Sequence, residues 1–468
     1  MPGTFVNIFG DQDSIFEDGS SWKPGFSDDD IKDFTNKEMI VSGPTADRQQ
    51  IPAGYTYFGQ FVDHDITRDD RALSKASHGE AKNLRTPTLD LDSVYDLPTD
   101  SRILSFDDST DTFKVYIRKT DLHKLPYKDL PRNGGKAIIG DDRNDENAIV
   151  CQLHLAFLLA HNELVKRTGS YRRAKQTLRW LYHWVILEDF LPRIVHHDIL
   201  ELALKNQSYV NRGPFGKLKD NDMPAEFSYA AYRFGHSMVR DDYQTNSSPF
   251  FGSNEPVTLF DEKLKNDPTK DDLTGGRPLQ SRQVIQWDQF LKMATSKVGF
   301  PQKAMPIDTK LSSSLARLGM NNDKGSVDNF LAARNIIRGI RVNIPNAQFV
   351  AGRVNKELAG LGAPGHLRAQ FPYDAGEPYE HSLWYYILKE AEKDGNGKLG
   401  IVGSYIVAFT FIRLLQKSKS WFNENPNWTP DDALDRGLRK EDKQDDPNWS
   451  LASIIRLSGL PISAEGSS

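Results

Sequence analysis

The segment Glu146–Arg167, ENAIVCQLHLAFLLAHNELVKR, carries the strongest helical pattern in the chain and indicates the class of the fold. Its apolar residues recur at spacings of three and four, which is the period of one face of an α-helix. Asp141 and Asp142 stand just upstream, and aspartate side chains cap helix N-termini well. The segment therefore predicts a long helix packed in the protein core.

Further helical patterns lie on both sides of this segment. Arg172–Leu204 has the same spacing of apolar residues, but Pro192 should kink or end its first part because proline has no amide hydrogen. Three more helices are predicted at Tyr55–Ile66, Phe227–Val239 and Tyr405–Phe422.

Strand signals are sparse along the chain. The best is Thr112–Ile117, TFKVYI, which is typical of one arm of a hairpin. Residues 241–285 and 301–330 are polar and rich in Asp, Asn, Gly and Ser, so we expect long surface excursions there. The sequence predicts a mainly α fold with little β structure.

One large helical domain is expected to occupy most of the chain. No long linker and no internal repeat interrupts the chain. We place the domain at residues 45–430. Residues 1–44 are expected to form an N-terminal extension that wraps the core. Residues 431–468 are expected to form a C-terminal extension packed on the same body.

Composition argues against a nucleic-acid partner, a disulfide bond, a thiolate metal site and a transmembrane segment. The 468 residues include 59 Lys and Arg against 64 Asp and Glu, and this lack of a basic excess argues against a nucleic-acid partner. Cys151 is the only cysteine, so neither an intramolecular disulfide nor a thiolate metal cage can form. Met1–Gly10 lacks a basic region followed by an apolar run, and the apolar run near Ile401–Leu415 is too short to span a bilayer. We expect no transmembrane segment, in a protein that is cytoplasmic or exported without a cleaved leader.

Phe58–Arg68, FGQFVDHDITR, is the first segment whose residues suit chemistry. On a helix, Gln60, Asp63 and His64 share one side because offsets of three and four residues coincide. Asp65 lies about 200° round the helix from Asp63 and must face a different environment. The segment offers a base with two polar neighbours, although an exposed acidic helix with a hydrogen-bonded histidine explains it equally well.

Asn83–Tyr95, NLRTPTLDLDSVY, alternates residues that carry side-chain oxygens. Four of them fall on one side of an extended loop: Thr86, Thr88, Asp90 and Asp92. Carboxylates, hydroxyls and carbonyls are the hard oxygen donors that calcium selects. The alternative is a solvated strand without a metal ion.

Gly140–Asn147, GDDRNDEN, precedes the long helix. Arg143 and Glu146 are three residues apart and can face the same pocket. The alternative is an ion pair at a surface helix start, worth only about 0.2–0.5 kcal/mol.

Ala230–Arg240, AAYRFGHSMVR, places Gly235 beside His236. Glycine permits close backbone approach, which suits a bulky planar ligand packed against the segment. A lone histidine in an apolar helix is otherwise an ordinary core residue.

Taken in order, the four segments resemble the animal-type haem peroxidases of the peroxidase–cyclooxygenase superfamily. A fifth segment agrees: Asn335–Pro345, NIIRGIRVNIP, looks like the family's Asn-x-x-Arg-Gly motif. Residues 161–167, HNELVKR, and 187–195, LEDFLPRIV, are also similar to family segments. The likeness covers about residues 45–430 and implies one helical haem-binding domain.

The resemblance implies a role for each residue at a matching position. His64 would be the distal histidine and Arg143 the arginine that act on hydrogen peroxide, with Gln60 beside them. His236 would be the proximal ligand of the iron of haem b, and Asn335 would accept the proton on its Nδ1.

The resemblance also implies further contacts to cofactors. Asp63 and Glu146 stand where family members form ester links to the haem. Arg233 and Arg338 match family arginines near the haem, and Arg338 would pair with a propionate. A calcium ion would be held by Asp65, Thr86, Thr88, Asp90 and Asp92.

The implied activity is a peroxidase reaction. Hydrogen peroxide is reduced, and small organic donors or anions such as bromide, iodide and thiocyanate are oxidised. Asn147 stands where some members have a methionine bonded to the haem, which argues against chloride oxidation. After the Asn-x-x-Arg-Gly motif, Ile340–Asn343 replaces the Arg-Asp-His-Gly of many members.

Two other enzyme classes and a haem-free binding protein are the alternatives. A fatty-acid oxygenase of the same superfamily would need a radical tyrosine three residues before the proximal histidine, where this chain has Arg233; Tyr232 is four residues before it. A helical phosphohydrolase could use a His–Asp metal site from His183, His197 and Asp198, but it would explain none of the other motifs.

Overall fold

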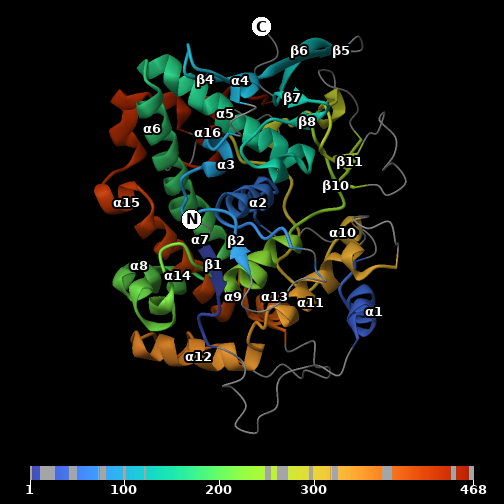
Figure 1. Ribbon diagram of the computed structural model, residues 1–468, viewed down its shortest axis with the longest axis vertical. Coiled ribbons are helices and arrows are strands. Elements are labelled where there is room, and N and C mark those ends of the chain that lie inside the picture. Colours follow the sequence, from blue (N-terminus) through green and yellow to red (C-terminus); the bar gives the residue numbers. More distant parts are fainter. Residues whose placement is uncertain are drawn as a thin grey trace.

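Helix α5 (Ala148–Thr168) is the long core helix that the sequence predicts (Figure 1). It begins two residues later than predicted because Asn147 is its N-cap, with Oδ1 accepting hydrogen bonds from the amides of Ile149 and Val150 at 3.1 and 2.9 Å. The helix ends at Gly169, whose φ of 64° favours glycine. By length and composition alone α5 could span a membrane, but it is almost wholly buried inside the protein.

The computed structural model describes fourteen parts of the chain: residues 3–10, 27–41, 50–71, 73, 81–97, 102–120, 123–247, 255–260, 272–294, 299–316, 318, 325–370, 382–443 and 449–462. Besides α5, the helices are α1 (Asp28–Glu38), α2 (Gly54–Ile66), α3 (Asp92–Tyr95), α4 (Arg102–Ser105), α6 (Tyr171–Trp184), α7 (Leu191–Ile194), α8 (His197–Lys205), α9 (Ala225–Tyr229), α10 (Ser313–Ala316), α11 (Leu331–Arg341), α12 (Ala347–Gly360), α13 (Leu383–Asp394), α14 (Ile401–Lys417), α15 (Trp421–Glu424) and α16 (Leu451–Ser458). The strands are β1 (Gly3–Val6), β2 (Lys82–Asn83), β3 (Phe106–Asp107), β4 (Thr112–Phe113), β5 (Tyr116–Thr120), β6 (His123–Asp129), β7 (Arg132–Asn133), β8 (Lys136–Ala137), β9 (Met223–Pro224), β10 (Asp242–Tyr243) and β11 (Val257–Thr258).

The fold is mainly α, as predicted, and its strands are short. β1 pairs with β2 in antiparallel and with β9 in parallel orientation, while the other strands form two-stranded antiparallel pairs. Figure 1 shows helices filling most of the body, with the β5–β6 hairpin at the top of the view and α12 along the bottom. α5 packs against α2, α6 and α16, so segments from both ends of the chain meet at the core helix.

The helix predicted at Arg172–Leu204 forms in pieces. α6 continues into a π-helical turn, Val185–Phe190, and then into α7, which contains Pro192 at its second position. The wider π turn accommodates the proline ring, which would otherwise clash with a carbonyl of the preceding turn. The helix therefore passes through Pro192 and ends at Ile194.

The single helix predicted at Phe227–Val239 is wrong. α9 ends at Tyr229, Ala230 breaks the helix with φ −134° and ψ −75°, and a 3-10 helix follows at Ala231–His236 (η8). A tighter 3-10 helix aligns residues three apart. Local periodicity does not reveal this break, because apolar residues continue on both sides of it.

Two other predictions need correction at their boundaries. The helix predicted at Tyr405–Phe422 begins earlier, at Ile401, and ends at Lys417, with a separate short helix α15 after it. The strand predicted at Thr112–Ile117 is divided between β4 and β5, because β4 pairs with β3 whereas β5 pairs with β6.

The predicted surface excursions at 241–285 and 301–330 are wrong for the described residues. Both segments bury apolar side chains, including Leu273, Ile285 and Leu311, each at most 1% exposed. The burial of these apolar residues could not be read from composition, because each of them is isolated among polar residues in the sequence. Parts of the two segments, residues 248–254, 261–271, 317 and 319–324, lie outside the described residues.

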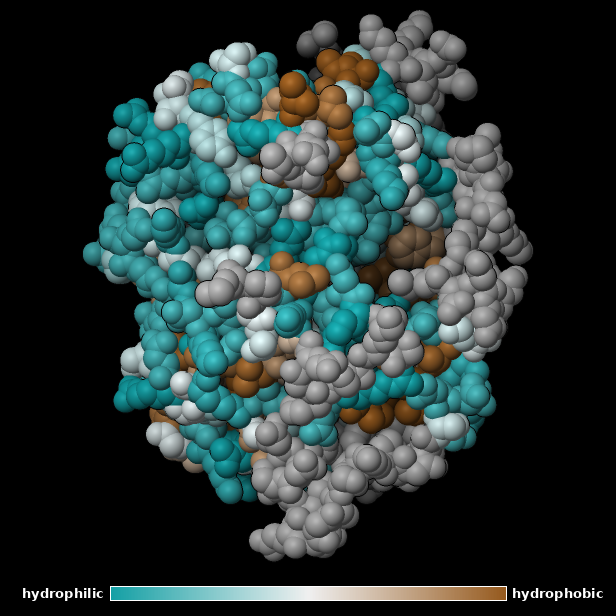
Figure 2. All heavy atoms as spheres, viewed as in Figure 1, coloured by the Kyte–Doolittle hydropathy of each residue, from teal (hydrophilic) through white to brown (hydrophobic). Residues whose placement is uncertain are grey.

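The visible face of the molecule is largely hydrophilic (Figure 2). A brown patch at the top lies where Figure 1 has α4 and β5. The exposed apolar side chains of those elements include Ile103 at 73% and Ile117 at 66%. Elsewhere on this face hydrophobic residues are scattered, as on ordinary protein surfaces.

Both terminal segments are held to the body by buried groups. Glu226 on α9 accepts hydrogen bonds from the amides of Ile8 and Phe9, at 2.9 and 3.1 Å. Near the other end, Asp189 in the π turn accepts from the amide of Leu451 at 2.8 Å. These contacts show how the described terminal residues pack. The domain limits at residues 44 and 430 stay predictions. Residues 11–26, 42–49, 444–448 and 463–468 lie outside the described residues.

The start of α2 is anchored to the same aspartate. The Tyr55 hydroxyl donates to both carboxylate oxygens of Asp189, at 2.9 and 2.7 Å, and Arg193 pairs with that carboxylate at 2.7 Å. Because α2 carries four of the predicted site residues, this buried network helps to set where they lie.

Candidate functional site

Three side chains from two segments converge beside the end of α2. The Gln60 Nε2 donates a hydrogen bond to Oε1 of Glu146. The same carboxylate oxygen lies 4.0 Å from Nε2 of His64. Gln60 and His64 share a face of α2, as helical spacing requires, and Glu146 follows the 3-10 turn Asp142–Asp145. The structure therefore brings together residues that are more than 80 positions apart in sequence.

Arg143 lies beside this group and is held by a buried carboxylate. Its guanidinium donates to both oxygens of Asp141, from Nε at 3.0 Å and Nη2 at 2.8 Å. Nη2 also donates to the backbone carbonyls of His64 and Thr67, at 3.0 and 2.8 Å. Arg143 is thus tied to the C-terminal end of α2 rather than extended into solvent.

Asp141 binds a second arginine as well. Nε of Arg85 donates to Oδ2 of Asp141 at 2.8 Å, and Asp141 is completely buried. Although burial opposes ionisation, the hydrogen bonds and charge of Arg143, together with the charge of Arg85, hold the pKa of Asp141 well below its usual range. Sequence analysis read Asp141 only as a helix cap, and nothing in its local pattern revealed this role.

His64 is neutral at ambient pH. Burial lowers its pKa to about 3, and the nearby charge of Arg143 acts in the same direction. Its Nδ1 lies 2.8 Å from Oδ1 of Asn144, and the Asn144 amide also contacts His154. Sequence analysis missed Asn144 and His154, although Asn144 directly follows Arg143.

Asp63 and Glu146 are carboxylates in a poorly solvated environment. Burial raises the pKa of Asp63, while Arg143 and Arg233 oppose that rise. Burial raises the pKa of Glu146 to about 7, again opposed by Arg143. The Glu146 side chain is 48% exposed, so the space that it faces, beside Gln60 and His64, is open; we call this space the recess.

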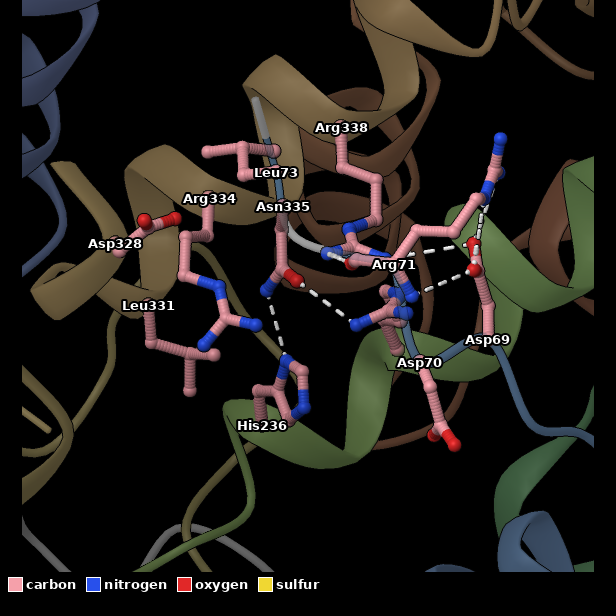
Figure 3. Close-up of a pocket in the computed structure, with 11 residues that line it drawn as sticks. Asp69, Asp70, Arg71, Leu73, His236, Asp328, Leu331, Arg334, Asn335 and Arg338 are labelled. Atoms are coloured by element: carbon pink, nitrogen blue, oxygen red, sulfur yellow. Dashed lines mark hydrogen bonds and ion pairs between the residues drawn. The ribbon is translucent and has the colours of Figure 1, made fainter. Parts of the chain in front are cut away.

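His236 ends the 3-10 helix η8 and faces Asn335 on α11 (Figure 3). The two side chains meet at 2.8 Å, between Nδ1 of His236 and Nδ2 of Asn335, while Arg233 donates to Oδ1 of Asn335 at 3.2 Å. The amide thus turns its nitrogen, not the expected acceptor oxygen, toward His236, because Arg233 takes the oxygen. A half-turn of the amide would exchange the two ends. Burial, followed by the charges of Arg233 and Arg334, lowers the pKa of His236 to about 3.

A cavity of about 420 Å³ opens beside His236 and is shown in Figure 3. It is within the size range of small-molecule and cofactor sites. Its lining comes from the loop after α2, from η8, from the 3-10 turn Val327–Asn329 and from α11. It consists of Asp69, Asp70, Arg71, Leu73, Arg233, His236, Asp328, Leu331, Arg334, Asn335 and Arg338.

Three arginines of this cavity repel one another. Burial and then the charge of Arg338 lower the pKa of Arg233 to about 10, and Arg338 also lowers the pKa of Arg334. Such a cluster favours a bound anion, because an anion relieves the repulsion. Sequence analysis missed Arg334, although it directly precedes Asn335.

Asp69 lies in the loop after α2 and forms part of the cavity wall. Its carboxylate accepts from Arg71 at 2.9 Å and from the Tyr229 hydroxyl at 2.7 Å, and Arg338 lies 3.5 Å away. Arg338 also donates to the carbonyl of Arg71 at 3.0 Å. These bonds orient the Arg338 guanidinium at the wall of the cavity.

The predicted calcium loop packs against the opposite side of α2. Asp65 is fully buried and accepts hydrogen bonds from the amides of Leu91 and Ser93 and from the Tyr182 hydroxyl, each at 3.2 Å. Burial, followed by the charge of Asp90, raises the pKa of Asp65 well above its usual range. Asp65 therefore occupies the different environment that its position on the helix predicts.

The other predicted calcium ligands lie in this loop but do not form a closed cage. The Thr88 hydroxyl donates to Oδ2 of Asp90 at 2.8 Å, and Oδ1 of Asp90 is buried with no hydrogen-bond partner among the described residues. Burial, then Asp90, raises the pKa of Asp92 to about 6, whereas Thr86 is exposed. In the described parts of the chain, no three imidazole, thiol or carboxylate groups converge as metal ligands do.

The residues proposed for a phosphohydrolase site do not assemble. His183 is fully buried, and its Nε2 contacts the carbonyl of Leu89 in the calcium loop. Asp198 lies at the surface, 3.3 Å from the exposed His366. His183 therefore holds the predicted calcium loop in place through Leu89, as a buried core histidine commonly does.

A comparison with protein-family models matches residues 67–346, more than half of the chain, to the animal haem peroxidase model. The match begins just after α2, so Gln60, Asp63 and His64 lie outside it. Among curated proteins, a peroxidase-like protein of Margaritifera margaritifera is 27% identical over 112 residues, which are 22% of this chain but only 14% of that protein.

Solved structures share the fold. Peroxidase A from Dictyostelium discoideum superposes with a TM-score of 0.59 at 12% identity, over 88% of this chain and 87% of its own. The fatty acid α-dioxygenase of Arabidopsis thaliana gives 0.58 at 14% identity, over 95% and 75%. A Y379F variant of the Oryza sativa fatty acid α-dioxygenase, solved with palmitic acid, gives 0.54 at 13% identity, over 94% and 78%. At these identities the likeness concerns the fold alone.

The position of Arg143 predicts how Glu146 titrates. Arg143→Gln should raise the pKa of Glu146 above about 7, because the guanidinium charge favours the ionised carboxylate. Asp142→Asn should lower it, since the charge of Asp142 acts in the opposite direction. Carbon-13 NMR titration of glutamate-labelled protein measures both shifts, with Glu146→Gln assigning the signal. An unchanged or lowered pKa in Arg143→Gln would mean that the guanidinium does not act on this carboxyl.

Proposed function

Since the chain belongs to the animal haem peroxidase family, we propose that it is a haem peroxidase acting on hydrogen peroxide. Its reductants would be small organic donors or anions such as bromide, iodide and thiocyanate. One observation carries the proposal: a buried, neutral His64 whose Nε2 faces Glu146, with Arg143 fixed beside it. A neutral imidazole next to a permanent cation is the pairing that peroxide cleavage requires.

The residues present fit a haem. His236 would ligate the iron through Nε2, since its lowered pKa keeps the imidazole neutral and a half-turn of the Asn335 amide would let the amide oxygen accept from Nδ1–H, which leaves the lone pair on Nε2. The mutually repelling Arg233, Arg334 and Arg338 would take the two propionates. A Cβ added at Gly235 would meet nothing within 4 Å, so the backbone beside His236 borders open space.

The iron, when bound, supplies the two-electron reduction of hydrogen peroxide. The task of His64 is to take a proton from the near oxygen of the peroxide and return it to the departing oxygen, which a neutral imidazole at ambient pH can do. Arg143 stabilises the negative charge that grows on the departing oxygen, a contribution of about 2.7–4 kcal/mol for one well-placed donor. Gln60, bonded to Glu146, orders the polar groups of the same recess.

Two further cofactor contacts belong to the proposal. Asp63 and Glu146 would form esters with haem methyl groups, each replacing a methyl C–H and a carboxyl O–H while one hydrogen peroxide becomes two waters. Calcium would bind at Asp65, Asp90 and Asp92 with Thr86 and Thr88. Within the described part of the chain Oδ1 of Asp90 is buried without a hydrogen bond, and this oxygen together with the raised pKa values of Asp65 and Asp92 supports a cation site there.

A fatty-acid oxygenase is the second candidate, and Tyr232 is the observation that favours it. Its hydroxyl is buried and has no hydrogen-bond partner within the described ranges, and its ring stacks on Phe227 with the ring centroids 4.7 Å apart. It nevertheless stands four residues before His236 rather than three. Oxygen uptake with palmitic acid, compared with peroxide-dependent oxidation of a small donor, separates the two activities in the haem-loaded protein.

The two histidines should behave differently when substituted. His64→Ala should keep haem but react with hydrogen peroxide about 10²–10⁴-fold more slowly, because acid–base catalysis is lost. His236→Ala should lose the iron ligand and most of the haem. Absorption spectra before and after peroxide report both, with the exposed His366→Ala as the control that changes neither. A wild-type rate in His64→Ala contradicts the distal role.

Calcium should stabilise the protein. A ligand bound only by the folded state raises stability by RT ln(1 + [L]/Kd), so the Tm should rise with added calcium and fall with a chelator. Asp90→Asn should abolish this response because it removes a negative charge from the site, whereas Asp96→Asn, at an exposed carboxylate of the same loop, should retain it. Untreated protein without calcium, and without a response to it, would identify the loop as metal-free.

Ester formation should depend on the two recess carboxylates. After peroxide treatment of the haem-loaded protein, acid–organic extraction should leave haem on the polypeptide. The double variant Asp63→Asn, Glu146→Gln should release all of it, and Asp142→Asn, at an exposed carboxylate, should not. Mass spectrometry should show no third bond at Asn147, which has no sulfur. Complete extraction from the wild type would leave the peroxidase proposal standing without the esters.

A further inference from the structure

Asn144 lies between two buried histidines. Its Oδ1 is 2.8 Å from Nδ1 of His64, and its Nδ2 is 3.0 Å from Nδ1 of His154. Asn144 and His154 have no exposed surface, and His64 is 6% exposed. One amide therefore contacts one ring nitrogen of each histidine, away from water.

The two ends of the amide determine where each imidazole carries its proton. An amide oxygen only accepts, so the neutral His64 must donate from Nδ1, which leaves the lone pair on Nε2. That Nε2 is the atom 4.0 Å from Glu146, on the recess side. The amide nitrogen only donates, so His154 must accept at Nδ1 and carry its proton on Nε2.

The hydrogen-bonded series His64–Asn144–His154, which we call the array, ends inside the protein at Nε2 of His154. Its Nε2 is buried and has no hydrogen-bond partner in the described part of the chain. The ring of Phe61 packs against it at 6.0 Å, edge to face. No polar route continues from His154, so the array orients His64 but does not carry its proton away.

The backbone around Asn144 is rigid. Asn144 sits in the 3-10 turn Asp142–Asp145, whose last carbonyl accepts from the amide of Gly276, while Glu146 accepts from Gly275 at 3.0 Å. A Cβ on Gly275 would lie 1.8 Å from the carbonyl oxygen of Asp145, so only glycine fits this close approach. His154 is two turns into α5, the core helix.

We propose that Asn144 and His154 are positioning residues that hold His64 in the Nδ1–H tautomer, with Nε2 kept as the proton acceptor. The inference rests on the proposed peroxidase function for the task of His64, but the tautomer is a property of the protein itself. The opposite tautomer would present an N–H to the peroxide, and His64 could not take the first proton. Asn144 opposes it by offering an acceptor to Nδ1 of His64, while the amide nitrogen donates to Nδ1 of His154.

Nitrogen-15 NMR of the full-length chain with labelled histidine tests the tautomer directly. We expect His64 to show a protonated Nδ1 and a bare Nε2, and His154 to show the reverse, with His64→Gln and His154→Gln assigning the signals. A protonated Nε2 on His64 in the wild type would overturn the proposal. Because this spectrum needs no turnover, it stands apart from the test of peroxidase activity.

Substitutions at Asn144 separate orientation from general packing. Asn144→Leu has a similar shape but no acceptor, so the His64 signals should become a mixture of tautomers. The reaction of the haem-loaded protein with peroxide should slow about 10–100-fold, as for other residues that orient a functional histidine. Asn144→Asp keeps an oxygen toward Nδ1 and should restore the single tautomer. A single, unchanged tautomer in Asn144→Leu would refute the role of Asn144.

His154 provides a second test should Asn144→Leu fail to fold. His154→Leu removes the acceptor for the amide and should broaden or mix the His64 signals. His161→Leu is the matched control: His161 is also fully buried on α5, but it contacts Tyr95 and the carbonyl of Asp111 instead. It should leave the His64 tautomer unchanged. Equal effects of the two substitutions would show that His154 acts only through packing.

Discussion

The buried ion pairs of Asp141 connect the parts of this molecule that form the candidate site. One carboxylate, with no exposed surface, binds Arg143 and Arg85, and Arg143 in turn holds the last carbonyls of α2. A buried charge is tolerated only when it is paired and hydrogen-bonded, and removing one partner is costly. The loop that carries Arg85, the end of α2 and the turn before α5 must therefore keep one relative arrangement.

The turn at Asp142–Asp145 shows how much depends on that arrangement. It presents Arg143 to the carboxylate, Asn144 to His64 and, one residue later, Glu146 to the recess. Asn147 then caps α5, which commits its side chain to the helix start. Position 147 therefore has a structural task of its own, in addition to lacking the sulfur for a further haem bond. Local backbone geometry and site chemistry are determined together in these six residues.

Much of the fold could be predicted because its main helices are locally periodic. α5 and α2 follow from apolar spacing, and their caps shift the ends by only one or two residues. The division of residues 227–239 into α9 and η8 could not be predicted, since apolar residues continue on both sides of the break at Ala230. The packing of the polar segments after residue 241 could not be predicted either. Their few apolar residues are isolated in the sequence, and they contact the core only in the folded chain.

The sequence by itself determined the mainly α class, the membership of the family through ordered motifs, and which histidines, arginines and carboxylates are available for chemistry. Those are properties of residue type and spacing, which survive without knowledge of long-range contacts. The tertiary structure alone decided that Asp141 clamps Arg143, that Arg334 joins the cavity arginines, and that Asn144 links His64 to His154. Hydrogen bonds between buried groups need positions within about 3 Å, and only the packed chain sets distances that short between segments far apart in sequence.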